Sequence, residues 1–179
     1  GRTGSHCFGV IPFFPLAGRL PQEDALSLDR QKSSSNEGSI KVIVPRLSRI
    51  SNFDDLDPLI AEPDVSVTII EGGNALPGDA DLILIPGSKA TLADLVQIRE
   101  EGWDIDILAH HRRGGLIVGL WGGYQILGQM VRDPDGIEGP PGEAPGLGFL
   151  DVTTILTGNK SLAECVGSEN LSGQEVRGY

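Results

Sequence analysis

Four short apolar runs without polar alternation stand out in the middle of the chain. They occupy residues 40–44, 65–70, 82–85 and 116–120, and each is rich in leucine or in β-branched side chains. Strands of a parallel sheet have this composition, because helices cover both faces of such a sheet and bury every side chain. The four runs therefore predict the strands of one buried, mostly parallel sheet.

Segments with helical character lie between and after these runs, at residues 52–61, 91–112 and 123–131. Strands that alternate with helices predict an α/β fold in which helices flank the sheet. Residues 134–148 are rich in glycine and proline, and we expect them to form a long surface loop of the kind that often borders a site.

The first 38 residues are organised differently. Residues 8–12 form a short apolar run that predicts a strand, and residues 22–28 have helical spacing after Pro21. The stretch QKSSSNEG at residues 31–38 is polar and has no periodicity, so we interpret it as a linker. Residues 1–30 are too few to fold alone, and we expect one α/β domain at residues 39–179.

Charge and cysteine usage argue against several functions. The chain of 179 residues has a formal net charge of −11, which would repel a phosphate backbone, so nucleic acid is not an expected partner. No apolar run approaches the ~20 residues of a membrane span, and no membrane partner is expected. Cys7 and Cys165 lie far apart without a CxxC partner, which indicates neither disulfides nor zinc and fits a cytoplasmic location.

Two predicted strand ends carry unusual turns, and ligands of open parallel sheets bind beyond such ends. PGSK at residues 86–89 follows one strand, and WGGY at residues 121–124 follows another. A sharp strand-to-helix turn needs small neighbours, which Gly119, Gly122 and Gly123 supply. The backbone NH groups of Gly122 and Gly87 are then candidates for stabilising an oxyanion.

The tip of the second turn lacks a nucleophile. The indole of Trp121 has no ionisable group for attack. An α/β-hydrolase elbow, GxSxG, fits poorly as well, because residues 119–123 supply only the glycines.

The stretch WGGYQ at residues 121–125 resembles the C-x-G-x-Q elbow of class I glutamine amidotransferases, with Trp121 at the position of the catalytic cysteine. This resemblance implies the flavodoxin-like fold of that class and an oxyanion hole formed by the NH groups of Gly87 and Gly122. Since tryptophan replaces cysteine, we expect glutamine hydrolysis to be lost, and we expect the indole to fill the carboxamide pocket or to reshape the turn. The resemblance also implies substrate binding by three further residues, namely Gln125, Tyr124 and Ser88.

Within this class the chain is most similar to the cobyric acid synthase family. The likeness is carried by RISNFDDLDPL at residues 49–59, LIPGSKAT at 84–91, GLGFLDV at 146–152 and VRGY at 176–179. It implies amidation of corrin-ring carboxylates, from adenosylcobyrinic acid a,c-diamide to adenosylcobyric acid, with glutamine-derived ammonia and ATP. Glutamine, a corrinoid and the ligase domain are the implied partners.

The same resemblance assigns the parts of the chain. Residues 1–30 look like the end of the family's ATP-dependent ligase domain, and residues 39–179 look like its amidotransferase domain, which stops before the triad histidine. The ligase P-loop motif GxxxxGK[ST] is absent, so ATP and Mg²⁺ are expected to belong to the ligase domain and no cofactor to this chain. The alternatives are a non-catalytic scaffold or binding domain with this fold, or a cobyrinic acid a,c-diamide synthase, against which SNFDDLDPL argues.

Other polar and aromatic residues have ordinary structural explanations. His110 and His111 end a basic helix, which its dipole favours, and His6 is expected to have no role. Trp103 is expected in the core, and Lys89 could equally steer a carboxylate or be a solvated cation. Three acids are expected to stabilise a helix start rather than to bind a metal: Asp54, Asp55 and Asp57.

Overall fold

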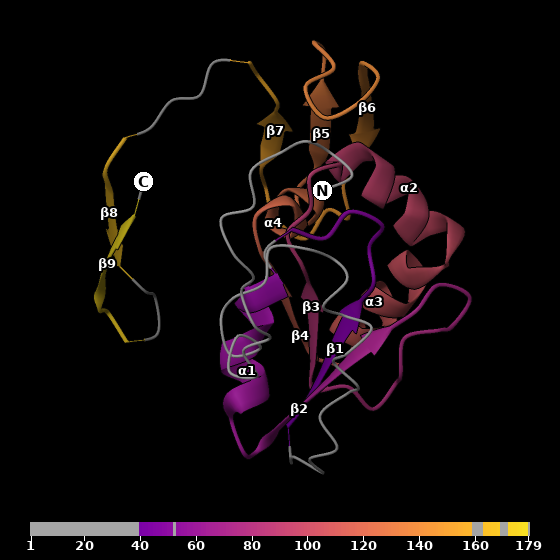
Figure 1. Cartoon of the computed structure of the whole chain (residues 1–179), viewed down its shortest axis with the longest axis vertical. Coiled ribbons are helices and arrows are strands. Elements are labelled where there is room, and N and C mark those ends of the chain that lie inside the picture. The colour runs from indigo at the N-terminus through magenta and orange to yellow at the C-terminus, as the bar shows by residue number, and fades with distance from the viewer. Residues whose placement is uncertain (1–39, 52, 159–162, 169–171, 179) are drawn as a thin grey trace, which may run out of the picture.

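A parallel sheet forms the centre of the molecule (Figure 1). The computed structural model describes residues 40–51, 53–158, 163–168 and 172–178. The strand order is β2-β1-β3-β4, and all pairings are parallel. The prediction of a mostly parallel sheet is confirmed, and the predictions for residues 1–38 lie outside the described residues. The strands are β1 (Ile40–Pro45), β2 (Val65–Ile70), β3 (Leu82–Ile85) and β4 (Leu116–Gly119).

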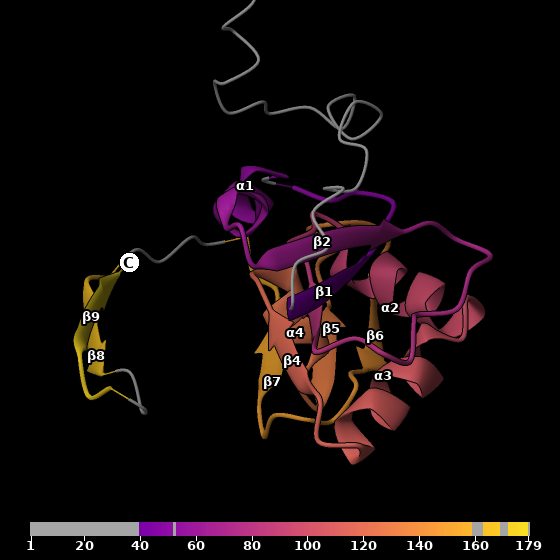
Figure 2. The ribbon, with the colours of Figure 1, turned by 90° about the horizontal axis from the view of Figure 1, so that it is seen from below.

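Helices cover the two faces of this sheet, as Figure 2 shows. Along β1 the side chains alternate, so that Val42 and Val44 join a core cluster with Leu56, and Ile43 joins a larger cluster that includes Ile107. None of the helices in the described part of the chain has the length and apolar character that a membrane span requires. The helical elements are η3 (Phe53–Leu56), α1 (Asp57–Ala61), α2 (Thr91–Glu100), α3 (Trp103–Arg112) and α4 (Gly122–Ile126).

The helical segment expected at residues 91–112 is two helices. Gly102 separates α2 from α3 and has a φ of 71°, a left-handed conformation that glycine adopts without strain. Trp103 follows and is fully buried, and its indole NH donates to the carbonyl oxygen of Asn74 at 2.8 Å. The expectation that Trp103 anchors its helix in the core is confirmed.

Two further expectations are wrong in part. The helix expected over residues 123–131 ends at Ile126, and the chain continues into the strand β5 (Met130–Asp133). The loop expected at residues 134–148 contains the strand β6 (Gly142–Pro145), which pairs antiparallel with β5. The strand β7 (Thr153–Ile155) pairs parallel with the other edge of β5. The secondary structure of this region therefore depends on pairing with strands that lie elsewhere in the sequence.

A hairpin stands beside the main body in both views (Figures 1 and 2). It consists of β8 (Cys165–Ser168) and β9 (Glu175–Gly178), which pair antiparallel. All eight residues of the two strands are exposed. The hairpin therefore contributes nothing to the core described above.

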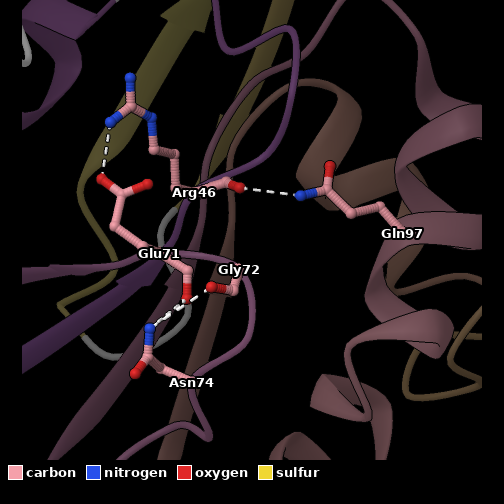
Figure 3. Close-up of polar contacts among 5 residues, drawn as sticks. All are labelled: Arg46, Glu71, Gly72, Asn74 and Gln97. Carbon is pink, nitrogen blue, oxygen red and sulfur yellow. Dashed lines mark hydrogen bonds and ion pairs between the residues drawn. The ribbon is translucent and has the colours of Figure 1, made fainter.

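Side chains hold the loops at the carboxyl ends of β1 and β2 (Figure 3). The Gln97 amide, on α2, donates to the carbonyl oxygen of Arg46 at 3.1 Å. The Arg46 guanidinium donates to the Glu71 carboxylate at 2.6 Å, and the Asn74 amide donates to the carbonyl oxygens of Glu71 and Gly72. These bonds fix the first residues after β1, which lead toward the candidate site.

Two isoleucines of α3 test this arrangement, because Ile107 is fully buried and Ile105 is 69% exposed. Ile107→Ala should lower the free energy of unfolding by about 2–5 kcal/mol, since it leaves a cavity beneath the sheet. Ile105→Ala is the matched control and should change it by about 0.5 kcal/mol or less. Urea unfolding measures both, and equal effects would contradict the assigned helix face.

Candidate functional site

The loops after β1 and β3 meet at the carboxyl edge of the sheet. These strands are neighbours, yet β1 leads to α1 on one face and β3 to α2 on the other, so the site lies at a topological switch point. The backbone NH of Ser51 donates to the carbonyl oxygen of Gly87 at 3.0 Å. The backbone NH of Lys89 donates to the carbonyl oxygen of Arg49 at 3.3 Å. The RISNFDD and PGSK stretches noted in the sequence are therefore bonded to each other.

The turn after β4 is packed against the end of β3 through glycine backbone. A Cβ at Gly123 would lie 2.2 Å from the carbonyl oxygen of Ile85, and a Cβ at Gly119 would lie 2.5 Å from that of Gly123. Neither distance is tolerable, so only glycine permits this approach. The small neighbours expected for a sharp elbow thus have a direct steric cause.

Trp121 stands at the tip of the elbow in a strained conformation. Its φ of 51° and ψ of −112° make it the one non-glycine residue with positive φ among those described, and side chains rarely adopt this region. The indole is 66% exposed. The ring is therefore not enclosed by protein, and the expectation that it occludes the carboxamide site or reshapes the turn stays a prediction.

The indole of Trp121 instead lies over the neighbouring loop. A Cβ at Gly87 would be 2.9 Å from the indole Cδ1, so the ring covers that glycine. The indole NH donates to Oδ2 of Asp55 at 3.1 Å. Partial burial raises the pKa of Asp55 above its usual value, against the opposing effect of this hydrogen bond.

The three acids lie in first helical turns as expected, Asp54 and Asp55 in η3 and Asp57 in α1, but no side chain caps α1. The N-cap position is Leu56, and no side-chain hydrogen bond caps the helix. Asp55 accepts the indole NH instead, which sequence spacing could not foresee. Among the described residues no group of three or more His, Cys, Asp and Glu side chains could hold a metal ion.

The three side chains predicted to bind substrate lie around the elbow with different exposure. Gln125 is half-buried, and its Oε1 accepts a hydrogen bond from the Thr91 hydroxyl at 3.1 Å, so it is not a free surface residue. Ser88 is buried, and its hydroxyl accepts from the Ala90 NH. Tyr124 is 47% exposed. Their roles in substrate binding stay predictions, as do those of Gly87 and Gly122.

Glu138 supports this region and was missed in the sequence. Its carboxylate accepts the backbone NH of Thr91 at 2.7 Å, at the start of α2. The buried carboxylate of Asp133 holds the Glu138 segment in place by accepting the NH groups of Ile137 and Glu138. Glu138 falls in the glycine- and proline-rich stretch, where no periodic pattern indicates a contact with α2.

Asp94 is a second residue without a sequence signal. It is fully buried on α2, and neither carboxylate oxygen has a hydrogen-bond partner. Burial raises its pKa to about 6, Glu138 adds to the rise, and Ser88 and Arg49 oppose it. The Ser88 hydroxyl is close enough to favour the charged form, although it makes no hydrogen bond of normal geometry with Asp94.

The two histidines lie in the last turn of α3, as expected. His110 is buried, and its Nε2 lies 2.9 Å from the carbonyl oxygen of Leu116, at the opposite end of β4 from the elbow. The His111 ring meets the Phe149 ring edge to face at 4.9 Å. Lys89 is exposed at the rim of the loop.

Comparison with known proteins places this site in a family. The model described as the CobB/CobQ-like glutamine amidotransferase domain matches residues 41–179. The chain belongs to this family. The sheet and its flanking helices are therefore those of the class I glutamine amidotransferase fold, as the elbow sequence implied.

Curated cobyric acid synthases match nearly the whole chain. The identity is 57% over 177 residues with the protein of Ruegeria sp. (strain TM1040) and 52% over 178 residues with that of Paracoccus denitrificans (strain Pd 1222). Both matches cover 99% of this chain, which spans 36% of the length of either relative. The solved PurLQS structure from Thermotoga maritima is 22% identical, with a TM-score of 0.44 over 55% of this chain and 50% of that one.

The strain at the elbow can be tested by comparing two replacements of Trp121. Trp121→Gly should be more stable than Trp121→Ala by about 1 kcal/mol, because only glycine adopts this φ and ψ freely. At Tyr124, inside α4, the preference should reverse: the free energy of unfolding of Tyr124→Ala should exceed that of Tyr124→Gly by about 1 kcal/mol. Thermal and urea unfolding of the four variants measure both differences, and the same sign at both positions would exclude a strained elbow.

The buried carboxyl of Asp94 should make stability depend on pH. Its pKa is about 6 in the folded state against 3.8 in a model compound, so the folded state binds more protons between these values and its stability falls as pH rises. Relative to Asp94→Asn, the free energy of unfolding should decrease by about 1–3 kcal/mol between about pH 4 and pH 7. Asp135→Asn, at an exposed position, is the control, and a pH-independent difference for Asp94→Asn would contradict the raised pKa.

Proposed function

We propose that this chain is the glutamine amidotransferase part of a cobyric acid synthase whose ability to hydrolyse glutamine has been lost. The observation that carries the proposal is the elbow: Trp121 holds the strained backbone of a nucleophile, beside Gly87, in a chain of the CobB/CobQ-like family. The relatives named cobyric acid synthase favour this substrate class over cobyrinic acid a,c-diamide synthase. A cytoplasmic location belongs to the same proposal.

In an elbow with cysteine at position 121, the reaction follows from the geometry. The thiolate attacks the carboxamide carbon of glutamine, and the NH groups of Gly87 and Gly122 stabilise the oxyanion. The amide nitrogen gains a proton and leaves as ammonia, which forms the thioester. Water then hydrolyses the thioester and releases glutamate. Gln125, Tyr124 and Ser88 contribute to binding glutamine around this point.

With Trp121 this sequence cannot begin, since carbon–sulfur bond formation needs a thiolate. The indole also packs against the Cα of Gly87, the residue that carries one of the two proposed oxyanion donors. Both effects support the loss of glutaminase activity. The chain keeps the scaffold of the site, because the glycine contacts at Gly119 and Gly123 do not involve the tip residue.

The amidation step belongs, in this proposal, to the ligase domain of the longer relatives. There ammonia would replace the leaving group of an ATP-activated corrin-ring carboxylate. The proposal assigns ATP and Mg²⁺ to that ligase domain, because the sequence of this chain has no GxxxxGK[ST] loop. No step through either is therefore assigned to it.

The exposed indole supports a second candidate function, that of a non-catalytic domain that docks a partner. A bulky aromatic side chain with 66% exposure is of the kind that interfaces use as an anchor. The ligase domain of the same protein is the partner of this candidate. The two candidates differ in what happens when the cysteine is restored.

Trp121→Cys should restore glutamate release in a chain extended past Tyr179 with the following residues of the Ruegeria relative. The same extended chain with Trp121 should release no glutamate above the buffer rate, because it has no nucleophile. Trp121→Ala is the matched control, since it removes the indole without adding a thiol. Glutamate is measured by coupled glutamate dehydrogenase.

Three outcomes distinguish the candidates. Activity in Trp121→Cys alone supports a damaged amidotransferase. Activity with Trp121 itself would overturn the predicted inactivity. Silence of every variant, combined with ligase-domain binding that Trp121→Ala weakens, would favour the docking function.

A further inference from the structure

The carboxylate of Asp55 faces the elbow from across the site. Its Oδ2 accepts a hydrogen bond from the indole Nε1 of Trp121 at 3.1 Å. Trp121 stands at the nucleophile position, 66 residues away in sequence. Asp54, its neighbour, is exposed, whereas Asp55 is half-buried. Asp55 is therefore aimed at the space directly above the elbow.

The indole NH marks where Asp55 accepts a hydrogen bond. With cysteine at position 121, the space that the ring occupies is open, and a partly buried carboxylate is left facing it without this donor. A ligand that reacts at the elbow and carries a positive hydrogen-bond donor a few bonds from its reacting carbon would satisfy this carboxylate. Glutamine has such a donor, its α-ammonium group, separated from the carboxamide by a short aliphatic chain.

We infer that Asp55 binds the α-ammonium group of glutamine and thereby selects an amino acid over other primary amides. The inference rests on the proposed function, because it assumes that glutamine enters this elbow. In this chain the indole NH of Trp121 already donates to the same carboxylate of Asp55. The residue that removes the nucleophile therefore also blocks recognition of the substrate.

The chemistry of this contact fits the position of Asp55. A hydrogen bond between an ammonium and a carboxylate is charge-assisted and stronger than one between neutral groups. Partial burial of Asp55 reduces screening by water, which favours the paired state further. Asp54 carries the same charge on the next residue but faces solvent, so it provides a matched comparison.

The test measures covalent labelling rather than turnover. In the 179-residue chain, Trp121→Cys is combined with Cys7→Ser and Cys165→Ser, so that the elbow holds the one thiol. Labelling reagents are the chloromethyl ketone analogue of glutamine, the same ketone without its α-amino group, and iodoacetamide. In the ketone reactions the thiolate forms a carbon–sulfur bond and chloride leaves, and intact-mass spectrometry gives the rates.

Asp55→Asn should slow labelling by the glutamine analogue by about 10-fold to 100-fold, because the charge-assisted bond is lost. Labelling by the ketone without the amino group and by iodoacetamide should change by about 2-fold or less. Asp54→Asn should change all three rates by about 3-fold or less. Unchanged iodoacetamide rates show that the elbow thiol is still formed and accessible in each variant.

Other results would overturn the inference. An equal loss with all three reagents would make Asp55 a structural residue, and no loss with the glutamine analogue would remove it from recognition. The chain with Trp121→Cys and the two serine replacements, unchanged at Asp54 and Asp55, is the reference. If it reacts no faster with the glutamine analogue than with the ketone that lacks the amino group, the elbow does not recognise glutamine. That result would overturn the proposed function as well, whereas the first two would leave it standing.

Discussion

The contact between the backbone of Gly123 and the carbonyl oxygen of Ile85 is the constraint on which the site depends. A side chain at position 123 would lie 2.2 Å from that oxygen, so the first turn of α4 can lie on the end of β3 only because the residue is glycine. This contact brings the elbow beside the loop that carries Gly87. Trp121 must then take a positive φ, and the fully buried Ile85 and Ile126 anchor the two sides of the turn.

The sheet could be predicted because burial on both faces leaves a direct trace in the sequence. Each apolar run became a strand within one residue of its expected bounds. Two kinds of feature left no such trace. The break at Gly102 is a backbone conformation inside a continuous helical pattern, and β5 has strand character because β6 and β7 pair with it from 9 or more residues away.

The site could be predicted as far as its backbone requirements go. Glycines at 119 and 123 are demanded by steric contact, and a sequence records such demands. The side-chain contacts are a different matter. Asp55 meets Trp121, and Glu138 meets Thr91, across 66 and 47 residues, and nothing in the local pattern of either acid distinguishes these bonds from helix capping or a solvated loop.

The residue at the tip contributes chemistry and strain but little to the folded core. Trp121 is 66% exposed, and its side-chain hydrogen bond goes to a half-buried carboxylate, so the packing around the fully buried Ile85 and Ile126 does not depend on the side chain at this position. The strain of the tip depends on backbone geometry and is present for every residue other than glycine. Folding therefore requires the glycines at positions 119 and 123 but not a particular side chain at the tip of the elbow.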